Sequence, residues 1–574
     1  MYIQRVPNRA SRPCLLLRED RREGKRIVKK TLANLTDWPL LVVDGLRGLL
    51  QGGTGAQVAS GFTIVRSLPH GHVAAVLTTL KQLGLPRMLA ANGRKQRELV
   101  VAMIVARIIA PQSKFATVRG FQQETLANSL VQECGLGDLT EDDLYEAMDW
   151  LVERQETIEA KLAARHLHEG TFVLYDLTST WYEGHTCSLA KRGYSRDKKK
   201  GKPQIEFGLL CDVQGRPIAV KVFAGNTGDP TTVAHQIQAI RQRFKLKRIV
   251  LVGDRGMLTE ARIREELEGV EGLDWISALR GPAIQQLVET KAFTLSLFDE
   301  RDLAEITSPA YPGERLMVCR NPLLAEDRRR TRHELLDATE KGLAAIATAT
   351  QRKTRPLRGT QAIALRVGKI LNHYKMGKHF ELTITKTRLT YARKEAQIKA
   401  EAALDGFYVI RTSLASDRIT PEATVAIYKK LAGVERAFRC MKTVDLKVRP
   451  IFHRLETRVR AHIFLCMLAY YVEWEMRRLL APGLFDDEDA EQAAWHRRSI
   501  VAPAQRSATA KGKAATKQTK NGIPVHSFQT LLKDLATITK NHIRPNLANS
   551  PTFIQMTQPT PTQKKALDLL GAKL

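Results

Sequence analysis

Two short apolar segments, each followed at once by an aspartate, constrain the fold of this chain more than any other feature. Residues 171–175 have the composition of a buried strand and lead to Asp176, and residues 248–253 lead in the same way to Asp254. In an α/β sheet, functional side chains gather beyond the carboxyl ends of the strands. Either aspartate alone is often only a turn or cap residue. Two such strands in one chain predict an α/β sheet with a carboxylate site at its edge.

A third acid lies in a predicted helix. A good N-cap residue followed by a proline predicts one helix over residues 420–442. At about 100° per residue, Tyr428, Leu431, Glu435 and Lys442 fall on one face, which is otherwise apolar around Glu435. A buried carboxylate is costly unless a cation meets it. The helix is therefore either a core helix with one acid at its edge or the third part of a charged site.

The elements between these acids follow a recognisable order. The predicted elements are a strand at 172–175, strands at 205–211 and 218–223 about a tight turn, a helix at 232–244, a strand at 249–252, a helix at 259–268 and a strand at 274–279. The helix of Glu435 comes later in the chain. This order predicts an α/β fold with a ribonuclease-H-like core, because antiparallel strands come first and helix-linked strands follow.

These residues resemble the bacterial insertion-sequence transposases of the Asp-Asp-Glu class, in particular insertion-sequence family four and its relatives. The signature helix of that branch reads Tyr-x2-Arg-x3-Glu-x6-Lys. Tyr428, Glu435 and Lys442 match it, whereas Leu431 stands where the signature has arginine. The segment Asp254-Arg-Gly-Met is similar to the second-acid motif of the family. The resemblance covers residues 173–472, about half of the chain.

The resemblance implies a DNA transposase that cuts the transposon ends and transfers the 3′-OH into target DNA. Asp176, Asp254 and Glu435 would be its catalytic residues and would hold two Mg²⁺ ions, for which Mn²⁺ would substitute. Three carboxylates from separate elements suit a pair of divalent metals about 3.5–4 Å apart. Two alternatives stay open: a ribonuclease-H-like nuclease or resolvase that cuts without joining, and a decayed transposase that only binds DNA.

DNA is the implied partner, both as terminal inverted repeats and as target. Two ends must be held together, so the resemblance implies a homodimer in a synaptic complex. It also implies that Tyr428, Lys442 and Arg255 contact phosphates near the transferred end.

The charge of the chain agrees with a nucleic-acid partner. The formal net charge is +30 and the isoelectric point is near 9.9, which favours phosphate binding by counterion release. Ribosomal, RNA-binding and membrane-surface proteins share such a charge, so it does not single out DNA. Basic residues recur beside each acid, and this distribution predicts further DNA contacts at Lys202, Arg436 and Arg439.

Cysteine usage and hydropathy exclude several other classes. The seven cysteines are scattered without any CxxC pair, so neither a zinc site nor a disulfide scaffold is predicted. The longest apolar runs are too short to span a bilayer, and no signal peptide is predicted. A cytoplasmic protein with no membrane partner is expected, and the resemblance implies a bacterial one that acts on the nucleoid.

Composition shifts divide the chain into seven predicted segments. They are a β-hairpin region at 1–60, a helical region at 61–168, a core in two parts at 169–284 and 406–480 with an insertion at 285–405 between them, a basic flexible linker at 481–526 and a helical C-terminal segment at 527–574. The resemblance implies that the helical region at 61–168 binds the DNA ends, that the core is catalytic and that the insertion is β-rich.

Overall fold

The computed structural model describes residues 1–8, 13–23, 26–51, 62–92, 94–199, 201–298, 301–489, 499–502, 505–546 and 551–574. The chain forms two compact units. Unit 1 consists of residues 1–78, 119–138 and 530–574, and unit 2 consists of residues 79–118 and 139–529. Within the described ranges, no helix is long and apolar enough to cross a membrane.

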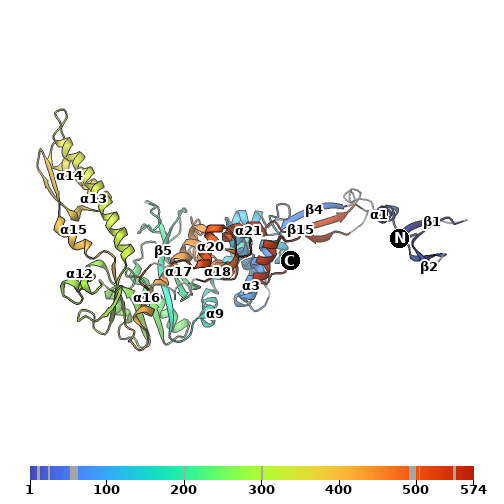
Figure 1. The fold of residues 1–574 in the computed structure, drawn as a ribbon, viewed down its shortest axis with the longest axis horizontal. Coiled ribbons are helices and arrows are strands. Elements are labelled where there is room, and N and C mark those ends of the chain that lie inside the picture. Colours follow the sequence, from blue (N-terminus) through green and yellow to red (C-terminus); the bar gives the residue numbers. More distant parts are fainter. Residues whose placement is uncertain are drawn as a thin grey trace. The chain divides into compact units, whose positions relative to one another are not determined.

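Unit 2 is built on a mixed sheet of eight strands (Figure 1). In sheet order the strands are β10 (Leu303–Ile306), β11 (Arg315–Arg320), β14 (Phe407–Thr412), β9 (Leu273–Ala278), β8 (Ile249–Val252), β5 (Thr171–Trp181), β6 (Gln204–Asp212) and β7 (Pro217–Ala224). The three strands β5, β8 and β9 run parallel, and the flanking pairs are antiparallel. The predicted α/β class is confirmed, and the strands follow one another along the chain in the predicted order.

Helices cover the sheet and link its parallel strands. Those between β7 and β9 are α10 (Val233–Gln238) with η2 (Ala239–Arg243), and α11 (Glu260–Arg262) with η3 (Ile263–Leu267). The others of the core are α4 (Leu85–Leu89), α5 (Lys95–Ile109), α6 (Lys114–Arg119), α8 (Glu141–Val152), α9 (Gln155–His166), α16 (Pro421–Lys429), α17 (Leu431–Arg439), η6 (Cys440–Val444) and α18 (Glu456–Leu480).

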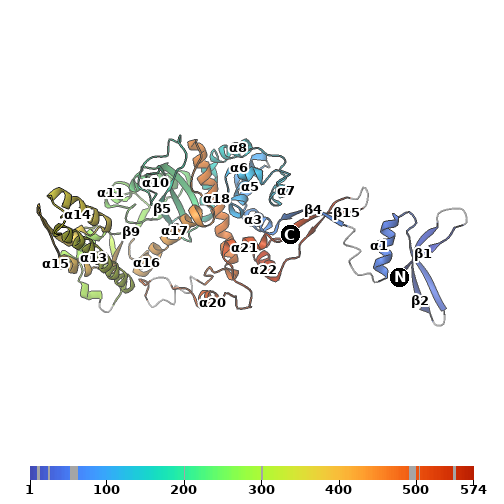
Figure 2. The same cartoon turned by 90° about the horizontal axis from the view of Figure 1, so that it is seen from above.

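Helix α18 is the central helix of unit 2. It packs on β7 and on helices α5 and α8, and Figure 2 shows it between these helices and the sheet. All residues from Ala461 to Glu473 are buried. Neighbouring elements therefore cover this stretch of the helix on all sides.

The segment between β9 and β14 is mainly helical, so the predicted β-rich insertion is wrong. Its helices are α12 (Gly281–Glu289), η4 (Leu295–Phe298), α13 (Pro322–Thr350), α14 (Thr360–Tyr374), η5 (Gly377–His379) and α15 (Glu395–Ala402). Two of its four strands, β10 and β11, extend the main sheet, and only β12 (Phe380–Ile384) and β13 (Leu389–Arg393) pair outside it.

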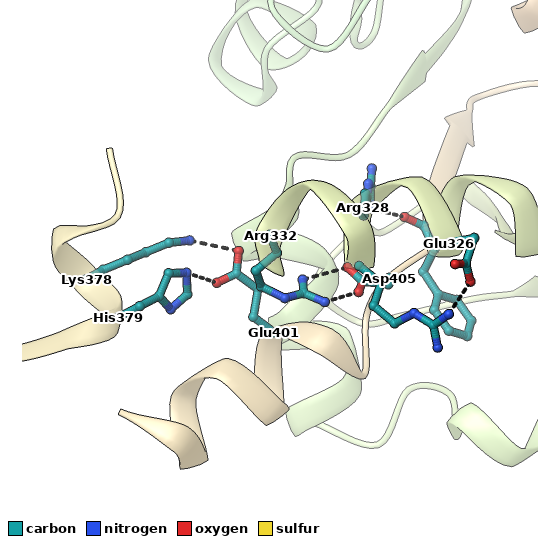
Figure 3. Close-up of polar contacts among 9 residues, drawn as sticks. Glu326, Arg328, Arg332, Lys378, His379, Glu401 and Asp405 are labelled. Atoms are coloured by element: carbon teal, nitrogen blue, oxygen red, sulfur yellow. Dashed lines mark hydrogen bonds and ion pairs between the residues drawn. The ribbon is translucent and has the colours of Figure 1, made fainter. Parts of the chain in front are cut away.

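Ion pairs join this helical insertion to the sheet. Figure 3 shows Arg332 of α13 donating to Asp405, two residues before β14, and both side chains are about nine-tenths buried. Glu401 of α15 meets His379 at 3.0 Å and Lys378 at 2.9 Å. A separate apolar cluster centred on Leu343 and Ile363 holds α13 and α14 together.

Unit 1 contains two small antiparallel sheets. The first is β1 (Tyr2–Val6), β2 (Cys14–Glu23) and β3 (Arg26–Asn34), which includes the predicted hairpin. The second pairs β4 (Phe62–Pro69) with β15 (Thr539–Pro545) and β16 (Phe553–Met556). The remaining helices that involve this unit are α1 (Leu40–Leu50), α3 (Gly71–Gln82), α7 (Leu130–Glu133), α21 (Phe528–Leu535) and α22 (Pro561–Leu570). The C-terminal segment is thus not purely helical.

The described part of the predicted linker is folded. Helix α20 (Ala508–Thr516) begins at a serine cap, and its Lys513 is 3% exposed. The Lys513 ammonium donates to two carbonyls. One is that of Ala481 at 2.8 Å, at the start of the short helix η7 (Ala481–Gly483), and the other is that of Asp486 at 2.9 Å, beyond this helix. The Ala/Lys/Thr composition predicts a solvated chain, but tertiary packing buries this lysine. Residues 490–498 and 503–504 of the predicted linker lie outside the described residues.

Candidate active site

Asp176 and Asp254 are neighbours because of the strand register. The parallel pairing of β5 with β8 ends at Leu174 and Val252, and each aspartate follows its paired residue by two positions. The sequence predicts that Asp176 lies just beyond the end of its strand. That prediction is wrong, because β5 continues to Trp181 by pairing with β6, which is longer than β8. The aspartate therefore lies where β5 loses its parallel partner but keeps its antiparallel one.

Asp254 opens a tight turn after β8. Its carboxylate accepts hydrogen bonds from the backbone N–H groups of Gly256 at 3.0 Å and Met257 at 2.8 Å. Its own carbonyl accepts from Met257 and Leu258. The side chain is exposed, and one carboxylate oxygen is free of these bonds, so the turn fixes the group while leaving it open to a ligand.

Glu435 projects from α17, which packs on β5 and β6. The single helix predicted over residues 420–442 is instead two α-helices and a wider final turn: α16 ends at Lys429, α17 begins at Leu431, and η6 starts at Cys440. The N–H of Gly433 donates to the carbonyl of Lys430 at this junction. Glu435 itself is exposed.

The three acids line one open hollow of about 430 Å³. Burial raises the pKa of Asp176 to about 7; the N–H of Leu177 and Arg196 oppose the rise, and Asp254 and Glu435 add to it. The carboxylate oxygens of Asp176, Asp254 and Glu435 do not all lie within 4.8 Å of one another. Divalent cations would relieve the mutual repulsion of these carboxylates, and carboxylate oxygens are ligands that such ions take.

Tyr428 belongs to the same site. Its side chain is half-buried, and burial raises its pKa to about 12, with further upward contributions from Asp254, Asp176 and Glu435 and a downward one from Arg255. These influences place the phenol among the acids, so it stays protonated at neutral pH and is available as a hydrogen-bond donor.

Lys442 is held by residues that sequence reasoning missed. Its ammonium donates to Thr178 at 3.0 Å and meets Asp197 at 2.7 Å, and it is 8% exposed. Arg449 pairs with the same aspartate and lies over the ring of Trp181. Asp197 is far from both cations in sequence and lies in a run of lysines, so no local pattern indicates this pairing. As placed, Lys442 orders the wall of the hollow, and its contact with DNA remains a prediction.

The other predicted DNA contacts are exposed. Arg439 lines the hollow of the acids, and Arg436 lies one helical turn before it. Arg255 lines a larger cleft of about 1130 Å³ that starts at Asp254 and runs between the sheet and the insertion. Lys202 is paired with Glu183 at 2.7 Å, and it is not among the residues that line either cavity.

Another carboxylate cluster has a different character. Cys440, Asp445 and Glu473 bring ligand atoms within 4.8 Å of one another, the only such group among the described residues. Arg477 already meets Asp445 at 2.8 Å and Glu473 at 2.7 Å. A cation is therefore in place, and the cluster is a buried ion-pair network that ties α18 to η6.

The chain thus has a mixed α/β fold with one hollow that gathers three carboxylates, from β5, the turn after β8 and α17. This combination defines a class of basic α/β proteins with an acidic site. Comparison with protein families narrows that class. Residues 168–472, just over half of the chain, match the transposase DDE domain, and the chain belongs to that family. The predictions of a DDE transposase and of DNA as its partner are confirmed at this level, and the family uses divalent metal ions.

Other comparisons add little. Among solved structures, the cryo-EM structure of a piggyBac transposase synaptic complex with hairpin DNA is similar with a TM-score of 0.33 and 9% sequence identity, over 81% of this chain and 76% of that chain. A likeness of this degree carries no argument about the site. No curated protein matches the chain.

Proposed function

We propose that this protein is a transposase of the insertion-sequence family four type, which cuts transposon ends and joins the 3′-OH to target DNA. The observation that carries the proposal is the convergence of Asp176, Asp254 and Glu435 on one hollow. A second support is the sheet order, because β7-β6-β5-β8-β9, with its first three strands antiparallel and its last three parallel, is the arrangement we expect of a ribonuclease-H-like core.

Asp176, Asp254 and Glu435 would hold the divalent ions, with Mg²⁺ as the expected metal and Mn²⁺ as a substitute. When bound, such ions lower the pKa of water and neutralise charge that develops on a phosphodiester. The turn at Asp254 and the packing of α17 hold the carboxylates in place beforehand, so little reorganisation is needed when the ligands bind.

The remaining residues would orient DNA. Arg439 beside the acids and Arg255 with Arg280 in the larger cleft offer cations on two sides of Asp254. Tyr428 would donate a hydrogen bond to a phosphate oxygen near the reacting bond. Leu431 supplies no charge where the signature has arginine, so phosphate contacts at that point would come from neighbouring residues such as Arg436. A bacterial cytoplasmic setting and a homodimer that holds two ends belong to the same proposal.

The proposal is tested by strand transfer. Purified protein would be mixed with Mg²⁺, labelled DNA that carries the ends of the element encoding the chain, and a target plasmid. Wild type should yield joined product, and Asp254→Asn should yield none. Glu271→Gln is a matched control, because this exposed carboxylate lies at the opposite end of the parallel strands, just before β9.

The outcomes separate the proposal from its alternatives. Cleavage without joining would indicate a nuclease or resolvase. Binding without cleavage, with several metals and verified ends, would indicate a decayed protein that only binds DNA. Loss of activity in Glu271→Gln as well would point to damage unrelated to the carboxylate site.

A further inference from the structure

A second hollow of unit 2 lies beside the carboxylate site. It has a volume of about 520 Å³ and is formed by the end of α5, the start of α6, the segment 447–455 and α18. This volume is within the range of small-molecule and cofactor sites, roughly 300–1,000 Å³. Arg449 lines both this hollow and that of the three acids, so the two are adjacent.

The lining of this hollow is cationic. It includes six basic residues and no aspartate or glutamate: Arg107, Lys114, Lys447, Arg449, Arg454 and Arg458. Arg449 and Arg458 have carboxylate partners outside the hollow, Asp197 and Asp149. The other four form no ion pair with a carboxylate in the described part of the chain. A concentration of positive charge without acids indicates an anionic ligand.

Lys114 is the most informative of these residues. It is 5% exposed, and within the described ranges its ammonium group has no hydrogen bond or ion pair. Burial lowers its pKa to about 7, and Arg107 lowers it further. Arg107 is also buried and donates to the carbonyls of Gln112 at 3.1 Å and Leu446 at 3.5 Å. The charged form of a buried lysine without a partner is costly, and an anion that reaches the group would stabilise that form.

The buried face offers another unused polar group. The Nε2–H of His462 donates to the carbonyl of Val448 at 3.1 Å, while its buried Nδ1 has no hydrogen-bond partner. His453 packs on it with ring centroids 5.0 Å apart. Both imidazoles line the hollow, and the unpaired Nδ1 of His462 is left to accept a hydrogen bond from a donor group of a ligand.

Two apolar side chains are exposed at the hollow, beside the exposed Lys447 and Arg454. Phe452 is 63% exposed and Leu455 is 52% exposed, and both line the opening. A large exposed aromatic side chain next to buried cations is suited to a ligand with a flat apolar part and a phosphate. Single-stranded nucleic acids have both, and their bases stack on aromatic side chains.

We propose that this hollow binds a backbone phosphate of the DNA strand that leaves the carboxylate site, with Lys114 and Arg107 at the phosphate and Phe452 against a base or sugar. DNA is favoured over a free anion because Arg449 lines both this hollow and the carboxylate site, and because the exposed Phe452 offers an aromatic face beside the cations. The inference rests on the proposed function, since it extends the path of the same DNA.

The test is the salt dependence of DNA binding, measured without divalent metal. Fluorescence anisotropy would follow labelled DNA carrying the element's end with a single-stranded extension, in EDTA, over a series of KCl concentrations. Removing the cation that neutralises one phosphate lowers the slope of log K against log salt by about 0.7–0.9. Lys114→Met should show that decrease and bind about tenfold more weakly at the lowest salt. Phe452→Ala should weaken binding about fivefold with the slope unchanged.

The matched control is Lys247→Met, which removes an exposed positive charge before β8, at the opposite end of that strand from Asp254. It should bind as wild type does. Lys114→Arg, which keeps the charge, should restore the slope. Phe452→Ala changes an exposed side chain, so it tests the same hollow if Lys114→Met fails to fold.

Two results would overturn the proposal. If Lys114→Met and Phe452→Ala both bind DNA like wild type, and inorganic phosphate raises the melting temperature of wild type but not of Lys114→Met, the hollow takes a free anion and not DNA. If neither DNA nor phosphate distinguishes the variants, it binds no phosphate. A changed slope in a protein that fails strand transfer would overturn the proposed reaction and leave this inference standing.

Discussion

At the scale of single residues, charge balance around the carboxylate site depends on Asp197. This side chain is 6% exposed and pairs with two cations, Lys442 and Arg449, both of which line the hollow of the three acids. Lys442 has a second polar contact in Thr178, whereas Asp197 is the one carboxylate paired with either cation among the described residues. Asp197 should therefore contribute more to the free energy of unfolding than either cation alone.

Removing either partner should have unequal effects. Asp197→Asn leaves two cations together in a largely buried place and should lower the free energy of unfolding by about 3 kcal/mol or more. Lys442→Met leaves the pair of Asp197 with Arg449 intact and should cost less. Urea unfolding followed by circular dichroism measures both. Equal losses, or a larger loss for Lys442→Met, would contradict this account.

A half-buried histidine predicts acid sensitivity. Burial lowers the pKa of His166 to about 4, and Arg216 and Arg165 lower it further, while Glu475 opposes them. Its ring contacts Tyr471 at 2.9 Å and Arg216 at 2.7 Å. The unfolded chain takes up a proton near pH 6.5 and the folded one only near pH 4, so stability falls as pH drops through this window, by about 1–3 kcal/mol for this group.

His166→Gln should flatten that fall. The amide keeps a hydrogen-bonding group but has no proton to take up between pH 6.5 and pH 4. Thermal melts of both proteins across this window give the comparison. The same steep loss in the variant would mean that other groups dominate the acid response.

At the scale of elements, contacts between segments far apart in the sequence determine where some helices end, which the local sequence pattern does not predict. Lysines and leucine at the junction of α16 and α17 are good helix formers, so the sequence predicts no break there. In the structure, Gly433 of α17 lies against Gly215, which has φ +81° in the turn between β6 and β7. Close packing of this kind depends on a segment far away in the chain, which a sequence window does not contain.

The extension of β5 is a different case. Residues 177–181 are rich in threonine and end in tryptophan, a composition that favours strands, so the sequence held a signal that the strand does not end at Asp176. The acids themselves and the order of strands were predictable because buried strands and strand-end turns are local features. The mainly helical insertion was not, because its assignment as β-rich rested on the resemblance.

The insertion should open independently of the sheet. Its apolar cluster is separate from the one beneath β11 and β14, and Leu343 is fully buried in it. Leu343→Ala should cost about 2–5 kcal/mol of local stability. Hydrogen exchange followed by mass spectrometry should show faster exchange in residues 322–402 and unchanged exchange in β5, β6 and β8.

Leu323→Ala is the control for that measurement. This leucine lies in the first turn of the same helix but is 61% exposed, so its truncation should leave exchange near wild type. Uniform acceleration across the sheet by Leu343→Ala would instead show that insertion and sheet unfold as one body.

At the scale of the whole molecule, residues from both ends of the chain fold together in unit 1. Unit 1 combines the first and last segments with residues 119–138, and the N–H groups of His70 and Gly71 both donate to the carbonyl of Ile538. A side chain at Gly71 would place its Cβ 2.4 Å from the carbonyl oxygen of Leu535 and 2.9 Å from Ile538. No sequence pattern indicates this junction, because its two sides come from opposite ends of the chain.

Gly71→Ala should therefore destabilise unit 1 selectively. Limited proteolysis should cut near β4 and β15 sooner, and fragments of unit 2 should persist as in wild type. Gly281→Ala is a matched control in unit 2, because a Cβ there meets no atom within 4 Å and the position has no positive φ. Equal susceptibility of the two variants would refute the steric argument.

The pairing of β4 with β15 also has a meaning for biosynthesis. β4 emerges early, with Phe62, Ile64 and Val65 exposed even in the finished protein, and its partner strand follows about 470 residues later. At roughly 5–20 residues per second, a nascent chain would carry this unpaired edge for about half a minute or longer. An exposed edge strand invites association with other chains. Only chains translated as far as β15 can cover it, so interrupted chains would remain marked for chaperones and proteases.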